Sequence, residues 1–137
     1  MLAFTPQPGA QRVLVLAEGE VSGAEYVEGL MAFLERDPAV LAWDFVYDLR
    51  RYRGSVGHDD LAELARRLGA AFGTIVSGAT TVLVSPDEGY RFWTRFMEVQ
   101  FPHRRFAWAA DLAEAEAILA AARRVGAPTP AGPARSC

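Results

Sequence analysis

Hydrophobic and polar positions follow two different periods along the chain, and their alternation predicts strands and helices in turn. Short apolar runs of strand length occupy residues 2–4, 12–17, 43–49, 81–84 and 105–110. Between them, apolar residues recur every three or four positions, as on the buried side of a helix, over residues 22–37, 57–72, 87–101 and 111–122. The predicted order of elements is therefore β-β-α-β-α-β-α-β-α.

Strands that alternate with helices are typical of a mostly parallel sheet with right-handed crossovers. The turn residues at positions 6–9 predict a hairpin between the first two strands, which would add an antiparallel edge. We expect a single α/β domain over residues 1–124. Residues 125–137 are rich in proline, glycine and alanine and are predicted to form a tail without a core.

Helix starts and stops support these boundaries. Ser22 and Glu25 form a capping-box pattern. Ser85, with proline next and glutamate three residues later, predicts a helix that runs from Asp87 to about residue 101. Asp111 is placed to cap the last helix.

Composition narrows the possible chemistry. The 137 residues are 51% hydrophobic, which suits one domain that folds unaided, and the net charge of -3 disfavours binding to a nucleic-acid backbone. All 14 basic residues are arginine, so lysine chemistry such as a Schiff base is excluded. One cysteine, Cys137, permits no internal disulfide, and no apolar run is long enough to span a membrane. We expect a soluble cytoplasmic protein that needs no metal or other cofactor.

The candidate site follows the strand at residues 43–49. Residues just past the carboxyl ends of parallel strands line the crevice where ligands bind in open α/β sheets. Asp48, Arg50, Arg51 and Arg53 occupy this position, close in sequence to His58 at a helix start. Arginines beside free helix N–H groups favour a small anionic ligand. The alternative is that these arginines are solvated and pair with nearby carboxylates.

The third helix is unusually aromatic. Phe92, Trp93, Phe96 and Met97 have the spacing of a buried face and are predicted to lie in the core, with Tyr90 nearer the crevice. If the aromatic stripe exceeds one buried face, the surplus would form a partner groove, a dimer surface or a lipid pocket.

Four short segments carry a resemblance to a known family. They are residues 48–50 (Asp-Leu-Arg), 59–61 (Asp-Asp-Leu), 84–90 (Val-Ser-Pro-Asp-Glu-Gly-Tyr) and 110–115 (Ala-Asp-Leu-Ala-Glu-Ala). Over roughly residues 1–122 the chain resembles bacterial STAS-like proteins, distant relatives of anti-sigma-factor antagonists that are grouped with CRAL-TRIO-type lipid-exchange folds. The resemblance implies a noncatalytic regulatory or binding module.

In anti-sigma-factor antagonists, a serine at the corresponding helix start is phosphorylated to switch partner binding. Residues 57–61 match that region and contain no serine, and Ser55 is the nearest. Because the chain departs from the family at this position, we expect a module without a clear phosphoswitch serine.

Three functional hypotheses follow. The first is a regulatory module that binds a protein partner or a ligand through Asp48, Arg50, Arg51, Arg53, Ser55, His58, Asp87 and Tyr90. The second is a carrier of a small molecule or lipid, with an acyl chain against the third helix and an anionic head group at the arginines. The third is a small enzyme in which His58 acts with Asp48 or Tyr90 as an acid-base pair. A homodimer through an edge strand or the aromatic helix is compatible with each.

Overall fold

A computed structural model describes residues 1–74 and 77–126 of the chain. The elements follow the predicted order. They are β1 (Leu2–Gln7), β2 (Arg12–Val21), α1 (Gly23–Arg36), β3 (Asp44–Gly54), α2 (His58–Phe72), β4 (Thr80–Val84), α3 (Tyr90–Gln100), β5 (Arg105–Ala109) and α4 (Leu112–Gly126). Two short 3-10 helices, η1 (Pro8–Ala10) and η2 (Pro38–Ala42), join β1 to β2 and α1 to β3.

One five-stranded sheet has the order β1-β2-β3-β4-β5. The strands from β2 to β5 run parallel, and β1 pairs antiparallel with β2. Gln11 closes the β1–β2 hairpin in the left-handed conformation, with φ of 50°. The predicted fold class, a mostly parallel sheet with an antiparallel edge at its amino-terminal end, is therefore confirmed.

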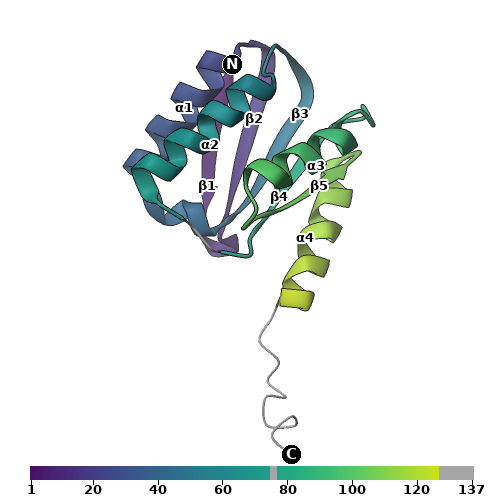
Figure 1. The fold of residues 1–137 in the computed structure, drawn as a ribbon. Coiled ribbons are helices and arrows are strands. Elements are labelled where there is room, and N and C mark those ends of the chain that lie inside the picture. Colours follow the sequence, from purple (N-terminus) through teal and green to yellow (C-terminus); the bar gives the residue numbers. More distant parts are fainter. Residues whose placement is uncertain (75–76, 127–137) are drawn as a thin grey trace, which may run out of the picture.

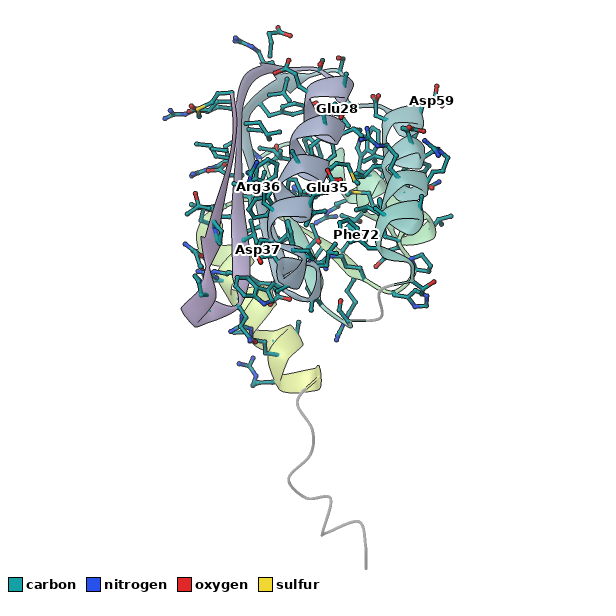
Figure 2. All side chains as sticks on the ribbon, turned by 90° about the vertical axis from the view of Figure 1, so that its left-hand side faces the viewer. Glu28, Glu35, Arg36, Asp37, Asp59 and Phe72 are labelled. Carbon is teal, nitrogen blue, oxygen red and sulfur yellow. The ribbon has the colours of Figure 1, made fainter. Side chains whose placement is uncertain are left out.

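Helices cover the two faces of the sheet unequally. Helices α1, α2 and α3 lie on one face and α4 lies on the other (Figure 1). Figure 2 shows α1 and α2 side by side and parallel, with Glu28 and Asp59 near one end and Asp37 and Phe72 near the other. The larger core lies under α1, α2 and α3, and a smaller core lies under α4.

Helix caps form as the sequence predicts. The Ser22 hydroxyl accepts a hydrogen bond from the Glu25 N–H at 3.1 Å, and the Glu25 carboxylate accepts one from the Ser22 N–H. Asp111 accepts from the N–H of Glu114 at 2.8 Å and caps α4. These bonds satisfy backbone donors that have no partner within the helix.

Strand β3 is longer than predicted. The arginines at positions 50, 51 and 53 were expected to follow the strand, and they belong to it instead. The strand continues through Gly54, and Arg51 pairs in register with Glu18 of the extended β2. Between the pairs Leu16–Asp48 and Glu18–Arg51, β3 contains one more residue than β2, which makes a β-bulge. The sequence pattern did not show this because the apolar alternation breaks at the bulge.

Helix α3 begins at Tyr90, three residues later than predicted. The Ser85 hydroxyl accepts a hydrogen bond from the Asp87 N–H, and the Asp87 carboxylate accepts one from the Gly89 N–H. These local bonds hold residues 85–89 in a turn, since short polar side chains compete with the backbone hydrogen bonds of a helix.

At the carboxyl end of the chain, α4 extends through Gly126, two residues into the predicted tail. The rest of that tail, including Cys137, lies outside the described residues.

Candidate functional site

A pocket of about 270 Å³ opens at the carboxyl-terminal half of β3, between the sheet and helices α1, α2 and α3. We call it the carboxyl-end pocket. Its walls are mainly aliphatic and aromatic. The lining residues are Leu2, Ala17, Val21, Tyr26, Tyr47, Leu49, Tyr52, Gly54, Val56, Leu61, Leu83, Tyr90, Trp93 and Met97. Clefts with such walls and a few polar groups are typical of small-molecule sites.

All four tyrosines of the chain line the carboxyl-end pocket. Tyr26 of α1 and Tyr47 of β3 lie at its floor, where their hydroxyl oxygens are 2.8 Å apart. Burial raises the pKa of Tyr47 to about 12 and raises the pKa of Tyr26 well above its ordinary value. The pair is therefore neutral at physiological pH and gives the floor one polar contact.

The rim of the pocket is built by the turn that follows β3. The Tyr52 hydroxyl accepts a hydrogen bond from the Val56 N–H at 3.1 Å. Gly54 leaves room for the Tyr52 ring, because a Cβ atom on Gly54 would lie 2.1 Å from that ring. Tyr52 is thus held across the end of its own strand.

His58, at the start of α2, packs against two aromatic rings of α3. Its imidazole stacks on Trp93 with ring centroids 4.7 Å apart and meets Phe96 edge to face at 4.3 Å. Among the residues that the structure describes, no hydrogen bond joins His58 to Asp48 or Tyr90, the partners of the enzymatic hypothesis. These ring contacts connect α2 to α3 beside the pocket.

The predicted arginine cluster lies on the other face of the sheet from the carboxyl-end pocket. Arg50 donates two side-chain hydrogen bonds to Asp48, at 2.9 and 2.8 Å, and these bonds lower the pKa of Asp48. Arg51 pairs with Glu18 at 3.3 Å. Because side chains alternate along a strand and Tyr52 faces the pocket, Arg51 and Arg53 point away from it.

The remaining predicted site residues are divided between the pocket and its surroundings. Tyr90 lines the pocket, as predicted, and it is half-buried. Asp87 closes the turn before α3. Ser55 is exposed between β3 and α2, and its N–H donates to the Val21 carbonyl at 3.4 Å. The structure therefore brings His58 and Tyr90 to the pocket region and separates them from the arginines.

Helix α3 differs from the predicted all-buried aromatic face. Met97 is buried, and Trp93 and Phe96 are half-buried. Phe92, predicted to be core, is 76% exposed, and Val99 one heptad later is 75% exposed. The helix packs Trp93 and Met97 toward the pocket, so Phe92 lies on its outer side and the prediction for Phe92 is wrong.

Two further hollows follow the carboxyl-end pocket along α2 and α3, and only the first of them adjoins it. The first, which we call the middle hollow, has a volume of about 80 Å³ and shares Tyr26, Tyr47 and Met97 with the pocket. The second has a volume of about 280 Å³ and lies where α2 and α3 end. We call it the amino-end hollow because the parallel strands begin at this end of the sheet. It shares Leu41, Leu68, Phe101 and Arg104 with the middle hollow.

Arg104 was not predicted as a site residue. It precedes β5, and its guanidinium donates to the Thr81 hydroxyl at 2.6 Å and to the carbonyls of Leu41 and Trp43. The group also lies over the Phe45 ring, 5.0 Å from the centroid. Burial lowers the pKa of Arg104, while the nearby Tyr47 and Asp44 oppose that effect.

Neither Arg104 nor the four-tyrosine lining had a clear signal in the sequence. Arg104 stands beside Arg105 before an apolar strand, and only the topology shows which of the two turns inward. The tyrosines are separated by up to 64 positions, from Tyr26 to Tyr90, and they meet only because parallel strands and helix starts share one end of the sheet.

Within residues 1–74 and 77–126, no group of three or more His, Cys, Asp or Glu side chains is arranged to hold a metal ion. Over the same residues, no helix combines the length and the apolar character needed to cross a membrane.

The five-stranded sheet, with three helices on one face and one on the other, defines a SpoIIAA-like fold. The structure is similar to that of an uncharacterized protein of the DUF3478 family, with a SpoIIAA-like fold, from Shewanella loihica PV-4. The two share 18% identity with a TM-score of 0.57, over 87% of this chain and 92% of the other.

A second solved structure is the Bacillus cell fate determinant SpoIIAA in its phosphorylated form, with 21% identity and a TM-score of 0.47 over 86% of this chain and 96% of that one. No family model and no curated protein sequence matches the chain. The similarity to the Shewanella protein confirms the STAS-like resemblance at the level of the fold.

Proposed function

We propose that the protein is a noncatalytic ligand-binding module that takes an apolar small molecule into the carboxyl-end pocket. The observation that carries this proposal is the pocket itself, about 270 Å³ in volume and lined by aliphatic and aromatic side chains. A ligand that fills such a pocket removes apolar surface from water on both partners, which is the main source of affinity for an uncharged site. A cytoplasmic location remains a prediction.

The surroundings of His58 support the noncatalytic part of the proposal. Its ring is packed between Trp93 and Phe96, and Asp48 is occupied by Arg50 on the opposite face of the sheet. A general base must come within hydrogen-bond reach, about 2.6 to 3.2 Å between heavy atoms, of the group whose proton it moves. His58 is exposed, and among the described residues its ring makes aromatic contacts and no hydrogen bond, which favours a packing role.

Native mass spectrometry and a fluorescence titration test the proposal. We expect protein purified without detergent either to carry a bound small molecule or to bind an apolar anilinonaphthalene dye with a change in tryptophan emission. Ala17→Leu adds three carbon atoms inside the pocket, and Ala62→Leu adds them on the exposed side of α2. We expect Ala17→Leu to weaken dye binding at least fivefold and Ala62→Leu to leave it unchanged.

The opposite pattern would contradict the proposal. Equal dye binding by both variants and the wild type would mean that the dye occupies another surface. A protein that carries no ligand and binds no apolar probe would mean that the pocket does not serve as a site. Thermal unfolding of each variant shows whether the added carbons disturb the fold.

Binding of a regulatory protein partner is a second candidate function, favoured by the outer side of α3. Phe92 and Val99 lie one heptad apart on that side, and both are mostly exposed. Large apolar side chains exposed together are typical of interaction surfaces. On the inner side of the same helix, Trp93 and Met97 line the pocket, so a bound ligand would contact the helix that carries the partner surface.

Sedimentation and cross-linking of the wild type and of a Phe92→Ser/Val99→Ser variant test this second candidate. We expect the wild type to form a complex, with itself or with a copurified partner, that the variant loses. An Arg51→Ala/Arg53→Ala variant tests the predicted arginine surface in the same experiment. If all three proteins behave alike, neither surface binds a partner under these conditions and the second candidate is withdrawn.

A further inference from the structure

Three cavities follow one another beneath the seam between α2 and α3. The carboxyl-end pocket adjoins the middle hollow at Tyr26, Tyr47 and Met97, and the middle hollow adjoins the amino-end hollow at residues that include Leu68 and Arg104. Helix α2 has 15 residues and is therefore about 22 Å long. The cavities thus extend along most of one helix, which is a suitable path for a long and narrow molecule.

The walls along this path are mostly apolar, and a charged side chain lines the middle and amino-end hollows. Arg104 is the charged residue in the lining of the middle hollow, where its neighbours include Leu34, Leu64 and Phe101. In the amino-end hollow it is joined by His103. Arg104 therefore lies between the middle and amino-end hollows, and an apolar path leads from it to the carboxyl-end pocket, which matches a ligand with one apolar chain and one acidic head.

The guanidinium of Arg104 has no carboxylate partner in the described part of the chain, where every ion pair involves other arginines. Its hydrogen bonds go to one hydroxyl and two carbonyl oxygens, all of them neutral. Each η nitrogen carries two N–H groups and makes one of these bonds, so one donor on each remains. Both remaining donors belong to one guanidinium, a group that binds carboxylates well.

We propose that Arg104 binds the carboxylate of a single-chain fatty acid whose apolar chain lies along the α2–α3 seam toward the carboxyl-end pocket. This inference rests on the proposed function, since the chain would occupy the same pocket. One guanidinium neutralises one carboxylate, whereas a doubly charged phosphate head would require additional cations. Folding has already removed the guanidinium of Arg104 from most of its water and fixed its orientation. Binding of an anion therefore does not have to supply that free energy.

A ligand series on the wild-type protein tests the inference without any substitution. Saturated carboxylic acids of 8 to 18 carbons are compared with the primary alcohols of equal length by calorimetry or dye displacement. We expect each acid to bind at least tenfold more tightly than its alcohol, because hydrogen bonds to charged groups are the stronger ones. We also expect each added CH₂ to tighten binding roughly fourfold until the path is filled, after which affinity levels off.

The outcomes separate this inference from the proposed function. If alcohols and acids bind equally, the pocket takes apolar ligands and the Arg104 head-group site is wrong. If neither series binds, the proposed function fails as well. If affinity for the acids does not depend on chain length, the chain does not lie along the seam.

Variants of Arg104 provide the second test. We expect Arg104→Gln to lose the preference for acid over alcohol, and Arg104→Lys to retain only part of it because an ammonium lacks the planar fork. Arg105→Gln is the control, since Arg105 is exposed and donates to the Gly78 carbonyl. If folded Arg104→Gln keeps the full preference, the site is wrong. If that variant does not fold, the acid and alcohol series on the wild type decides alone.

Discussion

The Tyr26 and Tyr47 hydroxyl groups lie 2.8 Å apart and form a buried hydrogen bond between α1 and β3. Their rings meet edge to face, with centroids 6.0 Å apart. Both rings line the carboxyl-end pocket and the middle hollow, so the bond lies where the two cavities meet. It joins α1 to the sheet and leaves a polar contact in walls that are mostly apolar.

Removing both hydroxyls of this pair should cost less stability than the sum of the two single removals. In Tyr47→Phe, the Tyr26 hydroxyl stays buried without its partner, so we expect the free energy of unfolding to fall by about 1 to 3 kcal/mol. The Tyr26→Phe/Tyr47→Phe variant should lose less than the sum of the two single variants. Urea unfolding of all three measures this, with Tyr90→Phe as a control expected to lie within about 0.5 kcal/mol of the wild type. Strict additivity would show that the hydroxyls are not coupled.

Stability should fall in alkali because of the same two tyrosines. The folded pKa is about 12 for Tyr47 and well above 10 for Tyr26, whereas unfolded tyrosine ionises near 10. The unfolded chain therefore releases these protons first, and the stabilisation present below pH 10 is lost as the pH rises through 12. We expect a maximum slope of about 1.4 kcal/mol per pH unit for each tyrosine.

The absence of lysine makes this measurement unusually direct, since no ammonium side chain titrates in the same range. Tyrosinate absorbance of the native protein should show that Tyr26 and Tyr47 ionise late, and partial burial raises the pKa of Tyr90 as well. In denaturant all four tyrosines should ionise together near pH 10. A Tyr26→Phe/Tyr47→Phe variant should have a flatter dependence of stability on pH. An equally steep profile in that variant would assign the alkaline loss to other groups.

Two glycine-to-alanine substitutions should change the free energy of unfolding in opposite directions. In Gly54→Ala the new methyl group would meet the Tyr52 ring, which must then leave its hydrogen bond with Val56, at a cost of about 1 to 3 kcal/mol. Gly69 lies inside α2 with open space around it, so Gly69→Ala should stabilise the protein by about 0.5 to 1 kcal/mol. Thermal or urea unfolding measures both. Stabilisation by Gly54→Ala would mean that the Tyr52 ring moves at no cost.

Gly23 and Asp60 should prove to be coupled. A Cβ atom on Gly23 would lie 2.0 Å from a carboxylate oxygen of Asp60, which accepts the Gly57 N–H and caps α2. We expect Gly23→Ala to cost about 1 to 2 kcal/mol through loss of that cap. In an Asp60→Ala background the same substitution should cost much less, since the obstructing side chain is absent. A double-mutant cycle with no coupling energy would contradict the contact between the two helix starts.

The order of elements was predictable because each depends on local pattern. Apolar periods of two and of three to four residues separate strands from helices, and Ser22 and Asp111 mark helix starts by bonds that span only three residues. Alternating strands and helices then imply the parallel sheet. The turn before α3 was missed since Ser85 can accept from either the second or the third residue after it, and a cap pattern alone does not distinguish them.

The site was only partly predictable because it depends on contacts between distant segments. A pocket does lie at the carboxyl end of β3, where the sequence led us to expect a site, and Tyr90 lines it. The arginines that follow Leu49 were expected at the same rim. They are turned to the other face by a bulge, which has no clear sequence signal in a run of charged residues. Arg104 lies far along the chain, and its inward direction depends on hydrogen bonds to Thr81 of β4 and Leu41 of η2, which are distant from it in sequence.

The bulge in β3 determines whether the wall of the carboxyl-end pocket is apolar or positively charged. Because neighbouring side chains in a strand alternate, a chain shortened by one residue at position 49 or 50 would reverse every position after it. Two guanidinium groups, from Arg51 and Arg53, would then occupy the wall that now belongs to Tyr52. A single inserted residue therefore sets which class of molecule this protein can admit.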